Sequence, residues 1–177
     1  GTFIPLHGID KIILAANELK ERKDIRFEIY GKGFLFNKIS PLAGKLGLSN
    51  IVFKGWVDYR ELNNVINTMD ICLGIFGDSI KTELVVPNKI FHYAACGKPI
   101  VTRDTTAIKE IFTPDRNIVL SANNPVSIAG AILHLADNPD LRTKIGQNAY
   151  NMINSEFNET KIALILINGF KKVLGKL

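Results

Sequence analysis

The sequence of 177 residues has little of what marks secreted or metal-binding proteins. It contains only two cysteines, Cys72 and Cys96, which lie in apolar runs without a CxxC spacing. A disulfide framework and a cysteine-based zinc site are therefore excluded, and we expect both cysteines to be reduced core residues of an intracellular protein. The three histidines lie far apart in the sequence, so no metal-ligand set or nucleophilic triad is predicted.

Long apolar runs and a signal-peptide pattern are also missing, so neither a membrane span nor secretion is predicted. The net charge of +5 suits a small anionic ligand, an acidic membrane surface or simply a solvated basic surface. The lysines Lys161, Lys171, Lys172 and Lys176 favour a solvated face over a membrane anchor. No repeat, low-complexity tract or linker divides the chain, so we expect one domain over residues 1–177.

Apolar segments of two kinds alternate along the chain, some with helical spacing and others short and continuous. Helices are expected at His7–Glu21, Leu35–Leu46, Asp58–Asn67, Pro87–Cys96, Ala107–Phe112, Pro125–Ala136, Leu141–Phe157 and Glu159–Leu174, and strands at Arg26–Tyr30, Ile51–Lys54, Asp70–Phe76, Pro99–Thr102 and Asn117–Leu120. Strands that alternate with helices and are apolar throughout indicate a parallel sheet covered on both faces. The predicted class is therefore a doubly wound, Rossmann-like α/β fold.

The chain opens on GTFIPLHG, which has the composition of a loop that leads from a strand into a helix. In a doubly wound sheet the first strand is central, and its loop lines the ligand crevice. We expect the first strand to have been removed ahead of Gly1, which would make Gly1 an engineered boundary. The sheet would then either close without that strand or take one from a partner.

The stretch Pro87–Val101 has the most informative pattern in the chain. Pro87 suits a helix start, and Asn88, Lys89 and His92 share one face of the helix that follows. Free N–H groups at a helix start, with a lysine beside them, form an anion site. A polar side chain one turn further on could meet a sugar hydroxyl, so the pattern indicates a nucleotide-sugar site.

These segments resemble the C-terminal, donor-binding half of GT-B glycosyltransferases, specifically the retaining glycosyltransferase family 4. The resemblance rests on the order and spacing of four segments: GTFIPLHGID at the start, FEIYGKG at 27–33, NIVFKGWVDYRELNNVINTMDICL at 50–73 and VPNKIFHYAACGKPIVTRDTTAIKEIF at 86–112. In that family the N-terminal half binds the acceptor, and the C-terminal half holds a UDP-, GDP- or ADP-sugar. The resemblance implies that this chain is the donor half and lacks the acceptor domain.

The resemblance also implies roles for two glycine-bearing turns. In the family, the first loop usually carries an arginine and a lysine for the diphosphate, as in GRxxPxKG. Here Thr2 stands at the arginine position and His7 at the lysine position, in the loop that starts at Gly1. Gly31 and Gly33 of the GKG segment match the turn after the next strand, which borders the cofactor-binding region.

Further roles follow from the segments nearer the middle of the chain. Gly55, Trp56 and Val57 match the segment whose backbone commonly touches the nucleobase. The loop Gly77–Val86 matches the loop for the donor sugar and phosphate. Lys89, preceded by Asn88, falls in the PxKxxEY-like helix start beside the diphosphate.

The two-glutamate motif of the family, E-x7-E, is altered in this chain. His92 stands where the second glutamate binds ribose hydroxyls, and the nearest acid to the first position is Glu83, one place before Leu84. Glu83 and His92 are therefore the catalytic candidates, with Glu83 toward the sugar and His92 toward the ribose. The alternatives are a loop acid at Glu83, a surface histidine at His92 and a solvated lysine at Lys89.

The resemblance implies a retaining hexosyltransferase that uses a UDP- or GDP-sugar as substrate, needs no metal or other cofactor, and acts on a glycan or lipid-linked acceptor. We expect a cytoplasmic protein, with the inner face of a membrane as an alternative location for the full-length enzyme, and no nucleic-acid partner. The isolated half should bind nucleotide but transfer nothing. Two alternatives remain, a GT-B sugar-nucleotide epimerase half and a non-catalytic binding or scaffold domain. A flavodoxin-like receiver is disfavoured because no acidic cluster follows a first strand.

Overall fold

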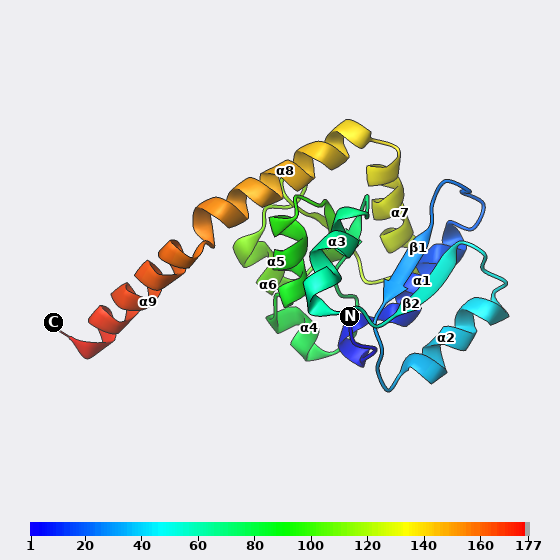
Figure 1. The fold of residues 1–177 in the computed structure, drawn as a ribbon, viewed down its shortest axis with the longest axis horizontal. Coiled ribbons are helices and arrows are strands. Elements are labelled where there is room, and N and C mark those ends of the chain that lie inside the picture. Colours follow the sequence, from blue (N-terminus) through cyan, green and yellow to red (C-terminus); the bar gives the residue numbers. More distant parts are fainter. Residues whose placement is uncertain (176–177) are drawn as a thin grey trace.

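The computed structural model describes residues 1–175, in which strands and helices alternate as expected (Figure 1). The elements, in chain order, are the 3₁₀ helix η1 (Pro5–His7), α1 (Ile9–Glu18), β1 (Phe27–Tyr30), α2 (Phe36–Lys45), β2 (Ile51–Gly55), the 3₁₀ helix η2 (Tyr59–Glu61), α3 (Leu62–Asn67), β3 (Cys72–Leu73), α4 (Ile80–Leu84), α5 (Asn88–Ala95), β4 (Ile100–Arg103), α6 (Thr106–Ile111), β5 (Val119–Ser121), α7 (Pro125–Ala136), α8 (Pro139–Glu156) and α9 (Glu159–Leu174). Every pair of neighbouring strands is parallel, which confirms the predicted fold class.

The strands form two separate parallel sheets within the described residues. One sheet contains β1 and β2, and the other contains β3, β4 and β5 in that order. In the first, Phe27 lies opposite Ile51; in the second, Cys72 lies opposite Ile100 and Val101 opposite Val119. Strands β1 and β3 are therefore edge strands of their respective sheets.

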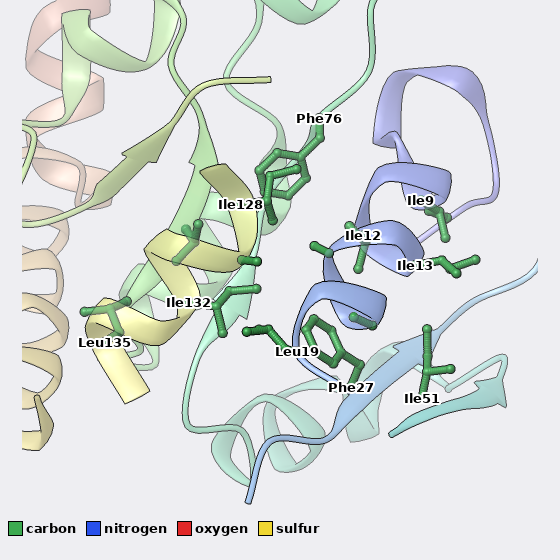
Figure 2. Close-up of a cluster of buried hydrophobic side chains, with 14 of the residues drawn as sticks. Ile9, Ile12, Ile13, Leu19, Phe27, Ile51, Phe76, Ile128, Ile132 and Leu135 are labelled. Carbon is green, nitrogen blue, oxygen red and sulfur yellow. The ribbon is translucent and has the colours of Figure 1, made fainter. Parts of the chain in front are cut away.

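Alternate side chains of the larger sheet enter two apolar clusters on its opposite faces. Val101 and Val119 pack in a cluster with α1 and α7, whereas Ile100 and Ile118 pack in another with α5, α6 and α8. The first cluster also contains Phe27 of β1 and so joins the two sheets. Figure 2 shows this cluster, with Phe76 and Ile128 lying together beside α7. Helices thus cover both faces, as continuous apolar strands require.

The first predicted helix and the third predicted strand are clearly shorter than the sequence indicated. The helix expected at His7–Glu21 begins only at Ile9, because Gly8 adopts a left-handed φ of 58° that separates η1 from α1. The strand expected over Asp70–Phe76 is confined to Cys72–Leu73. Beyond it, the Gly74 N–H still donates to the Val101 carbonyl (2.8 Å) and the Arg103 N–H donates to the Ile75 carbonyl (3.2 Å). The Ile75 amide, however, donates to the Thr102 hydroxyl oxygen (3.2 Å), so the pairing with β4 loses its regular spacing.

Two further expectations need correction. The segment Gly77–Val86, expected as a loop, contains the short helix α4, whose N-cap is Ser79. The Ser79 and Thr82 hydroxyl oxygens lie 3.1 Å apart across its first turn, and Thr82 is buried. Both cysteines are free, but only Cys72 is a core residue, because Cys96 ends α5 and is partly exposed.

Helix α9 extends away from the rest of the molecule and, among the elements, packs mainly on α8 (Figure 1). Its large apolar side chains, including Ile165, Phe170 and Val173, are exposed. Within residues 1–175, no helix is both long enough and apolar enough to cross a bilayer. Of the lysines predicted to form a solvated face, Lys161, Lys171 and Lys172 lie on α9, and Lys176 lies outside the described residues.

Candidate functional site

The loop Gly1–Gly8 lies between the segments that follow β1 and β3, at the carboxyl ends of the strands. A Cβ atom on Gly31, where φ is +137°, would lie 1.6 Å from the Gly1 carbonyl oxygen. A Cβ atom on Gly77 would lie 2.4 Å from the Pro5 carbonyl oxygen. Only glycine permits such close approaches. The loop is thus held at the edge where ligands bind in parallel α/β sheets.

Gly33 also packs against the first loop, at the backbone of Phe3, and does not face open space. Phe3 donates its backbone N–H to the Lys32 carbonyl (3.0 Å), and Leu35 donates to the Phe3 carbonyl (3.2 Å), on either side of Gly33. The Phe3 ring is fully buried and packs edge-on against Phe36, with centroids 5.1 Å apart. The GKG turn therefore holds the first loop in place, and only through that loop does it border the site.

Gly1, His7 and Lys89 come together from distant parts of the chain, as the sequence predicts. A Cβ atom on Gly1 would lie 3.1 Å from Lys89 Nζ and 3.2 Å from His7 Cε1. His7 is held in place because its Nδ1 donates to the carbonyl oxygen of Thr2, whose own side chain is exposed. These three residues, here called the Lys89 cluster, line one end of a groove of about 530 Å³.

Lys89 lies in the first turn of α5, where backbone N–H groups are still free. The first bond of the helix runs from the Ile90 N–H to the Pro87 carbonyl (2.9 Å), and no side chain caps this end. Pro87 is the N-cap, so α5 begins at Asn88, one residue later than predicted, and the Asn88 side chain is exposed. The amides of Asn88 and Lys89 are thus available to an anion.

The protonation of the Lys89 cluster leaves one strong cation in it at neutral pH. Burial lowers the pKa of Lys89 to about 8, which still leaves the amine mostly charged at pH 7. Burial and, second, the charge of Lys89 lower the pKa of His7 to about 4, so that imidazole is neutral. Among the described residues, Lys89 forms no ion pair. A bound anion would therefore supply its missing counter-charge.

His92 lies one turn beyond Lys89 on α5, beside the segment that follows β2. Its ring packs edge-on against Tyr59, with centroids 5.9 Å apart and an interplanar angle of 65°. Tyr59 begins η2, where the Asp58 carboxylate accepts from the Arg60 N–H (2.9 Å). Trp56 is 64% exposed and Tyr59 is 73% exposed, with Val57 partly buried between them in sequence. Exposed aromatic rings next to a polar helix face can stack on a planar ligand.

Glu83 belongs to a different group of side chains. It forms an ion pair with Arg103, the last residue of β4, whose other guanidinium nitrogen donates to the Gly77 carbonyl (2.6 Å). Arg103 is the less exposed partner, so it fixes the turn before α4 and the position of the Glu83 carboxylate. Nearby, Asp78 pairs with Lys11 and accepts from Asn123 Nδ2 (2.8 Å). Glu83 does not line the groove that ends at the Lys89 cluster.

Sequence reasoning missed Arg103 and Tyr59. Arg103 could have been noticed as a lone cation that ends the apolar strand Ile100–Arg103. Tyr59 was assigned to the helix expected at Asp58–Asn67, although it lies only two residues after the Trp56–Val57 segment. Over residues 1–175, no three of the histidine, cysteine and acidic side chains are grouped as metal ligands.

Comparisons with known proteins bear on this geometry. Residues 12–166 match the model of a family described as glycosyl transferase-like. Two uncharacterized glycosyltransferases of Methanocaldococcus jannaschii are similar to the chain: one is 27% identical over 175 residues, or 96% of this chain, and the other 30% identical over 156 residues, or 84% of it. The chain spans 42% and 40% of the lengths of these two relatives.

A solved structure shows the same fold at lower sequence similarity. Anabaena Alr3699/HepE in complex with UDP superimposes with a TM-score of 0.84 at 16% identity, covering 97% of this chain and 47% of that protein. Together with the parallel strands covered by helices on both faces, this match places the chain in the GT-B fold, as its C-terminal half.

Proposed function

Because the chain belongs to the glycosyl transferase-like family, we propose that it is the donor-binding half of a retaining hexosyltransferase, of the family 4 type that its motifs resemble. The donor is a UDP- or GDP-sugar, used as a substrate and without a metal or other cofactor. The acceptor is a glycan or a lipid-linked sugar, held by an N-terminal domain that precedes this half in the whole enzyme. The similar fold of a protein solved with UDP supports a nucleotide donor.

The Lys89 cluster is the observation that carries this proposal. A half-buried lysine that has no counter-ion among the described residues, at an uncapped helix N-terminus, matches the diphosphate of a nucleotide-sugar. His7 and the backbone around Gly1 and Thr2 form the wall of the phosphate site that faces Lys89. Asn88 adds its free backbone N–H group. Stabilising the leaving diphosphate is the main electrostatic task of the protein in such a transfer.

The rest of the nucleotide extends along α5 toward the segment after β2. His92, one turn from Lys89, takes the position of a ribose ligand, and as an imidazole it can donate to or accept from one hydroxyl. The base lies over Trp56 and Val57, where Tyr59 adds a ring beside His92. Gly31 and Gly33 act indirectly, by holding the first loop against this site. Glu83, positioned by Arg103, takes the role nearest the donor sugar.

A binding experiment tests the proposal. Titration calorimetry with UDP, GDP, ADP and uridine compares the wild-type chain with Lys89→Ala. The variant should lose about 1.5–3 kcal/mol of diphosphate affinity, the scale of a hydrogen bond to a charged group. Uridine, if UDP is the ligand, should bind both proteins equally. Lys144→Ala is the matched control, because Lys144 is an exposed lysine on α8. Equal losses for UDP and uridine would assign Lys89 to the fold and not to the phosphate.

A second candidate function is a non-catalytic nucleotide-binding or scaffold domain. The observation that favours it is the ion pair of Glu83 with Arg103, because Glu83 is the acid nearest to the family's catalytic position in the sequence. The whole enzyme distinguishes the two functions, since a scaffold would bind nucleotide but show neither hydrolysis nor transfer of the sugar. An epimerase would instead change the sugar while it remains attached to the nucleotide.

A further inference from the structure

A second hollow lies at the end of α5 opposite the Lys89 cluster. Its volume is about 530 Å³, which is within the range of small-molecule sites. The last residue of α5, Ala95, lies roughly 9 Å along the helix axis from Lys89, because each residue of an α-helix adds about 1.5 Å. The hollow is therefore at the amino end of β4, and none of the described residues that line it also lines the groove of the Lys89 cluster.

Side chains from two helices form the walls of this hollow, and the end of α5 forms its floor. Its lining consists of Asn63 and Asn67 of α3, Gln147 and Tyr150 of α8, and the floor residues Ala95, Cys96 and Gly97. Figure 1 shows α8 passing next to α5, against which it packs. Because three of its four wall residues carry side-chain amides, we call this site the amide hollow.

Close backbone contacts fix the shape of the amide hollow. Gly97 ends α5 with a left-handed φ of 67°, and its N–H donates to the Ala94 carbonyl (2.9 Å). A Cβ atom on Gly146 of α8 would lie 2.2 Å from the Gly97 carbonyl oxygen, so α8 crosses this corner in direct backbone contact. Lys98 Nζ donates to the Asn67 carbonyl (2.8 Å), which ties the end of α3 to the same corner. The walls are thus in place before any ligand binds.

The wall amides have unused hydrogen-bonding groups. In the described part of the chain, the Asn67 side chain takes part in no hydrogen bond, and Asn63 Oδ1 accepts only from the Cys96 thiol at 3.9 Å. Gln147 Nε2 donates to Asn151 (2.9 Å), and its Oε1 is left over. A side-chain amide offers both donors and an acceptor, so this lining can meet groups of either kind.

Tyr150 adds an aromatic face at the rim of the amide hollow. Its side chain is 43% exposed, and a Cβ atom on Gly97 would lie 3.9 Å from Tyr150 Cβ. The ring is therefore attached close to the floor while much of it faces solvent. An exposed tyrosine ring presents an apolar face to a ligand and a hydroxyl group at its tip.

The combination of amides and one aromatic ring fits an uncharged sugar. Each sugar hydroxyl both donates and accepts, and the C–H groups of a pyranose ring form an apolar face that packs on an aromatic ring. A phosphate or carboxylate ligand would call for a cation, but none of the described side chains that line the hollow is charged. A wholly apolar ligand would desolvate the amides without pairing them, at a cost in free energy.

The amides continue along α8 beyond the hollow. Gln147, Asn151 and Asn154 are spaced by four and three residues, so they share one face of the helix. All three side chains are exposed, and Asn154 Nδ2 donates to the Tyr150 carbonyl (2.9 Å), which leaves its Oδ1 for a ligand. A ligand seated in the hollow can extend along this row, as an oligosaccharide does and a single sugar does not.

We propose that the amide hollow binds one unit of a neutral oligosaccharide, whose next unit lies over the amides of α8. The sugar ring stacks on Tyr150, and its hydroxyls bond to Asn63, Asn67 and Gln147. This site is separate from the proposed donor site and needs neither a nucleotide nor the transfer of a sugar. In the proposed glycosyltransferase it keeps a glycan bound between transfers.

The test titrates neutral oligosaccharides onto the isotope-labelled chain. The probes are uncharged trisaccharides of glucose, mannose, galactose and N-acetylglucosamine, and NMR follows the side-chain amide signals. We expect at least one probe to shift the signals of Asn63, Asn67 and Gln147 with a Kd of about 1 mM, the strength given by a few hydrogen bonds and one stacked ring. If no probe shifts these three signals at concentrations up to about 50 mM, the proposal is wrong.

Variants of the ring separate stacking from a general effect on the surface. Tyr150→Ala should weaken binding of the active probe about tenfold, whereas Tyr150→Phe, which keeps the ring face, should retain most of the affinity. Asn64→Ala is the matched control and should bind like the wild type, because Asn64 is an exposed amide of α3 that donates to Glu61 (2.9 Å) outside the hollow. Unchanged affinity in Tyr150→Ala would overturn the proposal. If that variant does not fold, Asn67→Ala should weaken binding about fivefold, and unchanged affinity there refutes it instead.

Two further titrations distinguish this site from the donor site and from an anion site. UDP and GDP should bind Tyr150→Ala as they bind the wild type. Oligosaccharide shifts in a chain that binds no nucleotide would support the amide hollow and refute the donor site, and nucleotide binding without these shifts would do the reverse. Inorganic phosphate should leave the three amide signals unchanged. Shifts with phosphate that match those with the active probe would identify an anion site and refute the proposal.

Discussion

The low pKa of Lys89 predicts an unusual pH dependence of nucleotide binding. Burial lowers this pKa from 10.5 to about 8, because few groups around the amine stabilise its charge. Lys89 is therefore charged below pH 8 and neutral above it, so its attraction for a diphosphate is fully present near pH 7 and lost as the pH rises. At pH 9 only about a tenth of the free protein carries this charge, and the Kd for UDP or GDP should rise by about tenfold between pH 7 and pH 9.

The assay is calorimetry at half-unit steps from pH 6.5 to 9.5 with wild type and Lys89→Met, which keeps the apolar stem. The phosphates and the base of the ligand also titrate, but they affect both proteins alike and cancel in the ratio of the two Kd values. That ratio should be constant below pH 7 and approach one above pH 9. The Lys144→Met control should follow the wild type. A ratio independent of pH would refute the role of a titrating amine at the phosphate.

Three other changes examine separate parts of the molecule. In calorimetry, His92→Phe should weaken binding of UDP more than binding of its 2′,3′-dideoxy counterpart. Equal losses of affinity for the two ligands would show that His92 does not contact the ribose. Arg103→Gln should release Glu83 and the turn at Gly77, so in the whole enzyme kcat should fall by about tenfold or more while the Kd for UDP changes little, as expected for a positioning residue. Phe3→Ala should lower the free energy of unfolding in urea by about 3–5 kcal/mol, because a fully buried ring is removed. A loss below 1 kcal/mol would show that the first loop is not anchored by this ring.

Local sequence patterns predicted some helices to the residue. The helices Pro125–Ala136 and Glu159–Leu174 were expected with the bounds that the structure has. Each is preceded by an asparagine whose side-chain oxygen accepts from a backbone N–H three residues later, 2.9 Å away in both cases. Such caps lie within a few residues of the helix that they start, so they can be recognised without tertiary information.

The errors occur where the local pattern depends on distant residues. The apolar run Asp70–Phe76 looks like one long strand, but its pairing with β4 becomes irregular where the Thr102 hydroxyl accepts from the Ile75 amide. Likewise, the Lys89 cluster was expected from the segments matching a known family, whereas the Arg103–Glu83 pair joins residues 20 positions apart without any sequence pattern. The GKG turn was assigned to the ligand, although its first contact is with Gly1 and Phe3. In each case the deciding neighbour is brought in by the fold.

Helix α9 is expected to unfold locally, independently of the rest of the molecule. Its 16 residues are all exposed and make few contacts outside α8, so little buried apolar surface ties them to the rest. An isolated helix of this length is marginal in water. Opening of α9 therefore costs far less free energy than global unfolding, and the cooperative unit of the described chain ends near Phe157. Calorimetric and chemical denaturation consequently report on the two-sheet core, while α9 frays well below its transition.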